Sequence, residues 1–221
     1  MLKELERIAY LVRDAVRALP KDFDRGAEMY MGADGTPTSS IDKVAEDVIF
    51  KAVEDRGLEA NLLSEEAGLV DRGFEDTLVI DPIDGTHNSI LNVPMYSVSL
   101  AVGKRSLLGV EHAVLLDLVT GALYKASKGQ GATIDGERMS VRSLRSARPA
   151  TLLYLGRFVH PRTFEIVGRS SRVRAIGCAS LEMCLVAQGR FDAYYFNTKV
   201  YEKGIRVVDI AASALMLREA G

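Results

Sequence analysis

The sequence is poor in the residues that build several common functional sites. Of its 221 residues only two are cysteines and three are histidines. Cys178 and Cys184 lie in apolar surroundings without the spacing of a metal site, and His87, His112 and His160 are scattered along the chain. We therefore expect two buried, reduced thiols, and histidines that pack or lie at the surface rather than bind metal.

Long apolar runs and a surplus of one charge are also missing. No stretch reaches the length of a membrane span, and the first seven residues carry acids early and lack the apolar core of a signal peptide. The formal net charge of −2 leaves no broad basic surface for nucleic acid or an anionic membrane. We expect a soluble cytoplasmic protein that binds neither.

Several catalytic motifs are absent as well. No nucleophilic serine motif, Walker loop or dinucleotide fingerprint stands out. Gly103-Lys104-Arg105-Ser106 is similar to part of a P-loop but lacks the leading glycine spacing. Enzymes that depend on those motifs are therefore excluded.

What the sequence has is a hydrophobic content of 48%, enough to bury a sizeable core. Apolar periodicity predicts helices at 2–19, 40–53, 161–169, 180–188 and 209–219, with Pro20 stopping the first and Ser40 capping the second. Strands are predicted at 60–63, 78–81, 96–103, 110–116, 122–126, 151–155, 173–176 and 191–196, with a hairpin at 131–136. The polar, glycine-bearing segment 21–40 is interpreted as a loop.

The order of these elements is irregular, with meander-like strand pairs in the first half, so α+β layers fit better than a βαβ series. A composition change near Val141, where arginines precede Pro149, suggests two halves, 1–140 and 141–221, within one compact unit. A charged surface linker explains that change equally well.

The stretch Asp81-Pro82-Ile83-Asp84-Gly85-Thr86 is the most informative in the chain. It follows an apolar run that predicts a buried strand, and Pro82 is expected to end the ladder there. Two carboxylates at a strand end are a half-site for a hard cation such as Mg²⁺, while Gly85 and Thr86 suit a phosphate oxygen. An acidic strand-to-turn corner is the simpler alternative.

Other acids stand at comparable positions. Glu65 and Glu66 follow the strand at 60–63, Asp42 lies in the first turn of a helix, and Asp209 begins the last helix. Singly, they fit solvated loop residues or favourable partners of a helix dipole. Together they can converge at strand ends, and burying several carboxylates requires cations or protonation.

The chain resembles the inositol monophosphatase family of Mg²⁺-dependent, Li⁺-sensitive sugar phosphatases. The hexapeptide carries the resemblance, supported by Ile41-Asp42, Ser64-Glu65-Glu66, Gly177-Cys178-Ala179-Ser180 and Val208-Asp209-Ile210-Ala211-Ala212. It implies a layered α-β-α-β-α sandwich, a hydrolase of phosphoric monoesters and, typically, a homodimer. Relatives usually continue with further strands beyond the position of Gly221.

The resemblance also implies roles. Glu65, Asp81 and the carbonyl of Ile83 would hold one Mg²⁺; Asp81, Asp84 and Asp209 would hold a second; a third, weaker ion would lean on Glu65 and waters. Mn²⁺ is the expected substitute and Li⁺ the expected inhibitor. Thr86 with Asp42 would orient and deprotonate the attacking water, and the Gly85 and Thr86 N–H groups would bind phosphate. The catalytic residues would thus be Asp42, Glu65 and Thr86.

The substrate is less clear from the sequence. The loop from Gly32 to Thr38 looks like archaeal members that hydrolyse both inositol 1-phosphate and fructose 1,6-bisphosphate, whereas segment 196–208 is longer than in animal members. A small sugar or polyol phosphate is the expected partner. Candidate contacts are Tyr154, Arg174, Tyr201 and Arg206. The alternatives are a nucleotide 3′-phosphatase of the same superfamily and a non-catalytic member that acts as a binding partner.

Overall fold

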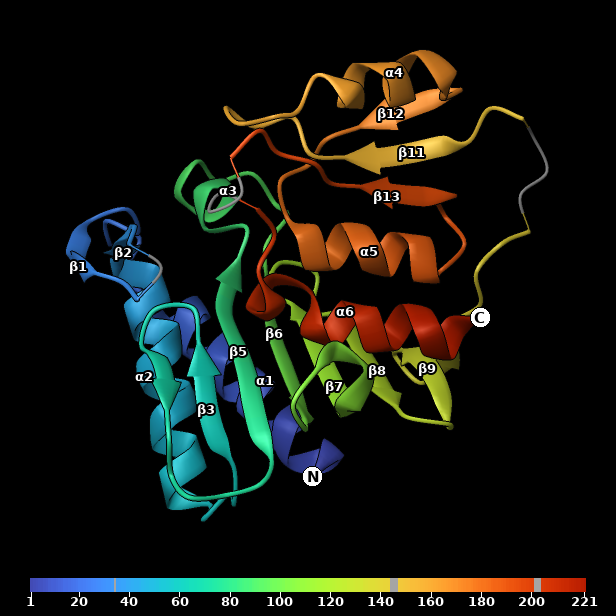
Figure 1. Ribbon diagram of the computed structural model, residues 1–221. Helices are drawn as coiled ribbons and strands as arrows, with labels where there is room; N and C mark the ends of the chain where they lie inside the picture. Colours follow the sequence, from blue (N-terminus) through green and yellow to red (C-terminus); the bar gives the residue numbers. More distant parts are fainter. Residues whose placement is uncertain (34, 144–146, 201–203) are drawn as a thin grey trace.

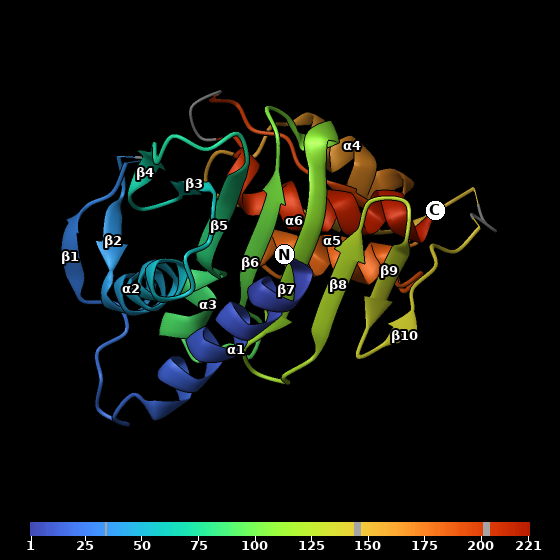
Figure 2. The same ribbon diagram turned by 90° about the horizontal axis from the view of Figure 1, so that it is seen from below.

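The computed structural model describes residues 1–33, 35–143, 147–200 and 204–221, and its elements stack in an α-β-α-β-α order (Figure 1). α1 (Leu2–Ala18) and α2 (Ser40–Asp55) cover one face of an eight-stranded sheet, and α5 (Ala179–Ala187) and α6 (Val207–Ala220) cover the other (Figure 2). A three-stranded sheet and then α4 (Arg162–Arg169) follow. The layered α+β prediction is confirmed.

The large sheet has the strand order β10-β9-β8-β7-β6-β5-β3-β4. Its strands are β3 (Asn61–Ser64), β4 (Gly68–Val70), β5 (Thr77–Asp84), β6 (Ser97–Gly103), β7 (Val110–Asp117), β8 (Leu123–Ser127), β9 (Gly131–Ile134) and β10 (Glu137–Arg138). Only β3 and β5 pair in parallel among these neighbours. Because parallel strands end at the same edge, the acids that follow β3 and close β5 are brought together.

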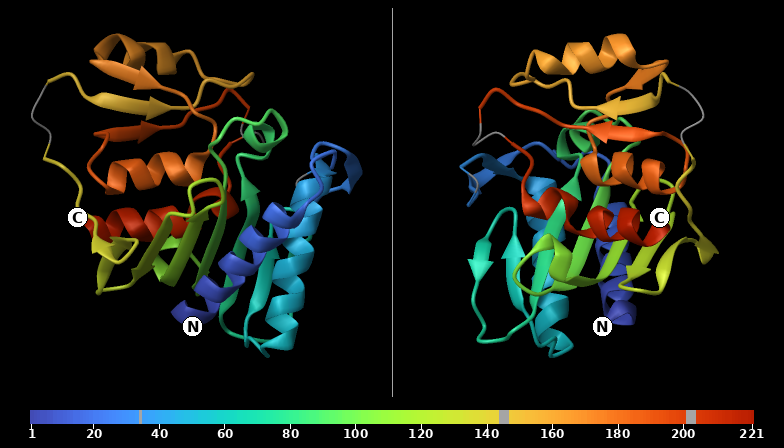
Figure 3. Two further views of the ribbon diagram at one scale, coloured as in Figure 1. Left: turned by 180° about the vertical axis from the view of Figure 1, so that it is seen from behind. Right: turned by 45° about the vertical axis from the view of Figure 1, so that its right-hand side comes forward.

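The small sheet consists of β11 (Ala150–Leu153) between β12 (Arg172–Arg174) and β13 (Ala193–Tyr195), all parallel. It lies between α5 and α4 (Figure 3). The remaining short elements are α3 (Thr86–Ile90) and the 3₁₀ turn η1 (Leu107–Gly109). Helices from the second half thus cover a sheet built from the first half, and the division near residue 140 stays a prediction.

Two apolar cores lie on opposite faces of the large sheet. The first packs α1 and α2 against it, with Leu5, Ile8 and Val12 of α1 completely buried. The second packs α5 and α6 against the other face and contains Cys178 and Cys184, which are buried free thiols as expected. Among the described residues, no helix has the length and apolar character needed to cross a membrane.

The segment predicted as a loop between residues 21 and 40 contains a hairpin. β1 (Glu28–Met31) pairs with β2 (Pro37–Ser39) in an antiparallel manner, and the hairpin projects beside α2 (Figure 3). All four side chains of β1 are exposed, so the apolar–polar alternation that marks a half-buried strand is missing from its sequence. The cap of α2 is also one residue earlier than predicted, because Ser39 rather than Ser40 receives the Asp42 N–H.

Pro82 does not end β5, contrary to the sequence prediction. The strand continues to Asp84, and its register against β6 shifts between Asp81, opposite Ser99, and Asp84, opposite Ser97. Between these two pairs, Pro82 and Ile83 of β5 oppose the single residue Val98 of β6, so a bulge accommodates the proline that lacks an N–H. The bulge places the hexapeptide carboxylates at an irregular, bent end of the strand.

Candidate metal and phosphate site

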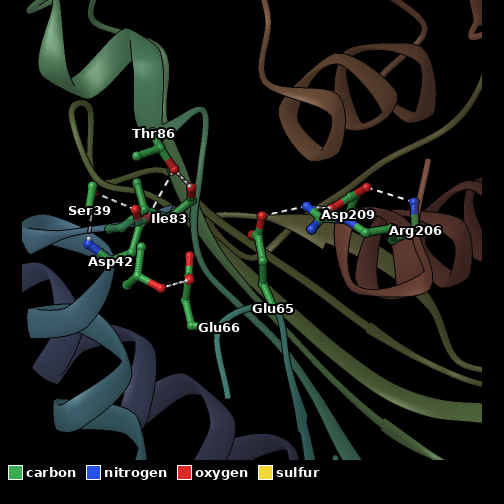
Figure 4. Close-up of polar contacts among 9 residues, drawn as sticks. Ser39, Asp42, Glu65, Glu66, Ile83, Thr86, Arg206 and Asp209 are labelled. Carbon is green, nitrogen blue, oxygen red and sulfur yellow. Dashed lines mark hydrogen bonds and ion pairs between the residues drawn. The ribbon is translucent and has the colours of Figure 1, made fainter. Parts of the chain in front are cut away.

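Three acids from separate elements converge at this end of the sheet. Glu65 directly follows β3, Asp81 lies in β5, and Asp209 lies in the first turn of α6. One carboxylate oxygen from each lies within 4.8 Å of the others. Figure 4 shows Glu65 and Asp209 extending toward each other from different elements. These are three of the predicted metal ligands, and oxygen donors at this spacing suit a hard divalent cation.

Asp81 is the most deeply buried member of this group. Its exposed fraction is 2%, and its Oδ1 atom has no hydrogen-bond partner among the described residues. Burial, followed by repulsion from Glu65, raises the pKa of Asp81 well above its usual value. A buried carboxylate oxygen without a donor is costly unless a cation or proton meets it, so the residues present fit a metal ion.

A guanidinium lies between the other two acids. Arg206 Nη2 donates to Glu65 Oε1 and, at 3.1 Å, to Asp209 Oδ1, while the Arg206 backbone N–H donates to Asp209 Oδ2 at 2.7 Å (Figure 4). Burial raises the pKa of Glu65 to about 8, although the charge of Arg206 acts in the opposite direction. The site therefore carries an internal positive charge in contact with two candidate ligands.

Asp84 is held by residues of the second half of the chain. Its Oδ2 atom accepts the Ser180 N–H at 2.6 Å and the Ser180 hydroxyl, and lies 3.1 Å from the Cys178 sulfur. Burial raises the pKa of Asp84, and the bonds from Ser180 counteract this. Asp84 is not one of the three carboxylates within 4.8 Å of one another, but it lines a cavity together with Asp209.

Thr86 connects the end of β5 to α2. Its hydroxyl donates to Asp42 Oδ1 at 2.9 Å and to the Ile83 carbonyl at 2.8 Å, and Ser39 donates to the other Asp42 oxygen (Figure 4). Burial raises the pKa of Asp42, while the bonds from Ser39 and Thr86 lower it. The predicted pair of Thr86 and Asp42 is thus in direct contact.

Gly85 has a conformation that favours glycine. Its φ is 86°, and a Cβ at this position would lie 2.8 Å from the Met95 carbonyl oxygen. Such a contact is too short for a side chain, and the positive φ adds strain for any other residue. Gly85 therefore lets the chain turn closely between β5 and α3, where phosphate binding by its N–H is predicted.

The candidate site residues line two cavities. One, of about 410 Å³, is lined by Asp84, Asp209, Arg206 and Tyr154 among others. The second, of about 470 Å³, is lined by Asp42, Glu65 and Thr86 and includes residues of β2. Because Glu65 lines one cavity and its partner Arg206 lines the other, this ion pair connects them.

The four predicted substrate contacts are placed differently. Tyr154 and Arg206 line the 410 Å³ cavity, where the Tyr154 ring packs on Phe196 with centroids 4.5 Å apart. Arg174 is exposed, donates to the neighbouring Val173 carbonyl, and is not among the residues that line this cavity. Tyr201 lies outside the described residues.

Residue-by-residue reasoning from the sequence missed the contacts that hold Asp84. The sequence places Ser180 in a glycine-led segment and at the start of a predicted helix, but its two bonds to Asp84 span 96 positions. Glu182 was not singled out, yet it is 2% exposed and accepts the Ile176 N–H at 3.0 Å. Burial raises the pKa of Glu182 to about 7. An acid inside an otherwise apolar helix was the available signal.

Fold and site together define the α-β-α-β-α phosphatase class, with acids at strand ends and a threonine at a helix start. The chain belongs to the inositol monophosphatase family, whose model matches residues 3–221. This confirms the resemblance found in the sequence and the prediction of a phosphoric monoester hydrolase.

Individual proteins that are similar to this chain in sequence or structure support this family assignment. The chain is 37% identical to a fructose-1,6-bisphosphatase/inositol-1-monophosphatase of Methanothermobacter thermautotrophicus, covering 97% of this chain and 80% of the relative. It is 34% identical to a bifunctional NADP phosphatase/NAD kinase of Methanococcus maripaludis, covering 100% of this chain and 42% of that protein. A crystal structure of an inositol monophosphatase–fructose 1,6-bisphosphatase superimposes with a TM-score of 0.84 at 30% identity, covering 99% of this chain and 83% of that one.

Proposed function

We propose that the protein is a Mg²⁺-dependent phosphomonoesterase that hydrolyses inositol 1-phosphate, fructose 1,6-bisphosphate or both. The observation that carries the proposal is the convergence of Glu65, Asp81 and Asp209, with a buried Asp81 oxygen that lacks a donor. The similarity to proteins named for these two activities supports the choice of substrates.

Mg²⁺ would be held by the converging acids, with Asp84 and the Ile83 carbonyl as further oxygen donors. When bound, a divalent cation lowers the pKa of water and stabilises the negative charge of a phosphate ester under attack. Mn²⁺ prefers a similar set of oxygen ligands and would substitute. Inhibition by Li⁺ would follow if it displaced one of two or three bound ions.

Thr86 and Asp42 would direct the attacking water. The only hydroxyl proton of Thr86 is shared between Asp42 and the Ile83 carbonyl, so the Thr86 oxygen is left as an acceptor. A water that donates to this oxygen is oriented by it, and the neighbouring carboxylate can take up its proton. The water oxygen then bonds to phosphorus as the bond from phosphorus to the sugar oxygen breaks, and the departing sugar oxygen takes a proton from a solvent water.

The sugar would occupy the 410 Å³ cavity. Its size is within the range of small-molecule sites, and its lining includes the carboxylates of Asp84 and Asp209 and the aromatic rings of Tyr154 and Phe196. Arg206 on the same cavity offers a positive charge to an anionic substrate. We keep the expectations of a homodimer and a cytoplasmic location as part of this proposal.

Phosphate release from both substrates, compared side by side at saturating Mg²⁺ with and without Li⁺, tests the proposal. Asp84→Asn is the matched variant, because it removes a charge while keeping the shape of the side chain. We expect turnover by the wild type and a loss of at least about 100-fold in the variant.

The same assay decides between the alternatives. One relative that matches the whole length of this chain is named a bifunctional NADP phosphatase/NAD kinase. NADP and a nucleoside 3′-phosphate are therefore included as substrates. Turnover of a nucleotide alone would replace the sugar-phosphate assignment. Equal inactivity of wild type and variant toward every substrate, with a protein that co-purifies, would replace the enzyme by a binding partner.

A further inference from the structure

A cationic side chain, that of Arg206, contacts two acids of the cluster. Arg206 precedes Asp209 by three residues and reaches Glu65, which is 141 positions away in the sequence. Both oxygens of Asp209 are engaged by Arg206, one by the side chain and one by the backbone N–H. These contacts involve two of the three acids whose oxygens lie within 4.8 Å of one another.

A divalent cation and this guanidinium compete for the same oxygens. A metal coordinated by Glu65 and Asp209 would lie within a few ångströms of Arg206 if the arginine stayed in place. Like charges at that separation repel, and they do so more strongly in a partly buried site than in water.

The Arg206 side chain also has open space beside it into which it can move. Its side chain is 36% exposed and it borders the 410 Å³ cavity. The backbone bond from Arg206 to Asp209 does not depend on the position of the guanidinium. The side chain can therefore leave Glu65 without disrupting the first turn of α6.

We propose that Arg206 is an internal counter-cation that neutralises the acidic cluster of the metal-free protein and must be displaced from Glu65 before a divalent cation binds. Arg206 thereby weakens metal binding and sets the concentration at which the site fills. In return, it stabilises the fold in the absence of metal. This inference rests on the proposed function only for its metal requirement.

Metal affinity measured without substrate tests the inference, so that inactivity toward a particular sugar phosphate leaves it unaffected. Mn²⁺ binding to the full chain would be followed by electron paramagnetic resonance and by calorimetry at one ionic strength. The variants are Arg206→Gln, which removes the charge, and Arg206→Lys, which keeps it. Arg172→Gln is the control, because Arg172 is exposed on β12 and donates to the neighbouring Ser171 carbonyl.

If Arg206 competes with metal, Arg206→Gln binds Mn²⁺ at least about tenfold more tightly than the wild type, while Arg206→Lys and Arg172→Gln remain closer to it. The metal-free Arg206→Gln protein unfolds at a lower temperature than the wild type, and added Mn²⁺ raises its melting temperature by a larger amount. Unchanged or weaker Mn²⁺ binding by Arg206→Gln overturns the inference.

If Arg206→Gln does not fold without metal, structures of the wild type with and without metal test the inference instead. Crystals grown with a chelator and with Mn²⁺ would show whether the guanidinium changes partners. Loss of the contact between Arg206 and Glu65 in the crystals that hold metal supports the inference. Retention of that contact beside a bound ion contradicts it.

Discussion

Ser180 donates two hydrogen bonds to one oxygen of Asp84, one from its backbone N–H and one from its hydroxyl. Asp84 ends β5 in the first half of the chain, and Ser180 lies in the first turn of α5 in the second half. The two layers that flank the site are thus joined at a candidate metal ligand, and the bonds fix the direction of the carboxylate. Replacing a residue that orients a metal ligand in this way typically costs about 10- to 100-fold in metal affinity or activity.

Removing the Ser180 hydroxyl should therefore weaken the site without removing a ligand. We expect Ser180→Ala to raise the Mg²⁺ concentration required for half-maximal activity by about 10-fold or more. A Mg²⁺ titration of phosphate release measures this change. Ser140→Ala is the control, because the hydrogen bond of the Ser140 hydroxyl within the described ranges goes to the neighbouring Val141 carbonyl and not to Asp84. An unchanged Mg²⁺ requirement in Ser180→Ala would show that the orientation of Asp84 does not depend on this bond.

The metal-free protein should lose stability as the pH rises. The pKa of Glu65 is about 8 in the folded protein and near 4.5 when unfolded, so the unfolded chain releases this proton first. Between pH 4.5 and about pH 8, the free energy of unfolding therefore falls as the pH rises, by at most about 1.4 kcal/mol per pH unit for one proton. Below and above this range, Glu65 contributes no pH dependence.

Urea unfolding in a chelator from pH 5 to 9 measures this dependence. Saturating Mg²⁺ should remove most of it, because a cation stabilises the ionised acids, and Glu65→Gln should reduce the slope without metal. A metal-free protein that becomes more stable across this pH range would contradict the burial of these carboxyl groups.

Glycine substitutions can separate backbone strain from a role in the site. Gly85 and Gly136 both have φ near 87°, at 86° and 88°, but only at Gly85 would a Cβ meet another atom, the Met95 carbonyl oxygen. We expect alanine at either position to cost about 1–2 kcal/mol of stability from the left-handed conformation, and more at Gly85.

Only Gly85→Ala should also lower phosphatase activity, because it moves the chain next to Thr86. Chemical unfolding together with the phosphate assay compares the two variants. Equal activity of both variants, once each is shown to be folded, would argue against a role for the Gly85 backbone in binding phosphate.

Substrate contact is tested at the cavity wall. Tyr154→Leu keeps an apolar side chain but loses the ring that packs on Phe196, so KM for a sugar phosphate should rise about 10-fold with a smaller change in kcat. Arg174→Gln is expected to leave both constants close to those of the wild type, because Arg174 is not among the residues lining the cavity. A large KM effect of Arg174→Gln with none from Tyr154→Leu would place the sugar elsewhere.

The sequence predicted the elements whose apolar pattern is strong. α1, β7 and α5 lie within a few residues of their expected bounds, because α1 buries a periodic apolar face and β7 and α5 are buried apolar runs. The hairpin of β1 and β2 was missed because β1 is exposed along its whole length, so its stability comes from pairing rather than burial. Pro82 was misleading because a bulge, which has no local sequence signal here, accommodates it.

For the site, the acids were found because they stand beside strand ends and helix starts. Their partners were not found in the same way. The bond from Ser180 to Asp84 and the bridge from Arg206 to Glu65 join residues 96 and 141 positions apart, and no periodicity encodes such a distance. Sequence motifs therefore located the candidate ligands, whereas the network that orients and neutralises them required the fold.

Asp81→Asn tests the central claim most directly, because this substitution should have opposite effects on stability and on function. It replaces a buried carboxylate whose Oδ1 lacks a donor by a neutral side chain of the same shape. The account predicts that the metal-free variant melts no lower than the wild type, gains no stability from Mg²⁺, and releases phosphate at least about 1,000-fold more slowly. Mg²⁺-dependent phosphate release by Asp81→Asn at a rate near that of the wild type would contradict the assignment of this cluster as the metal site.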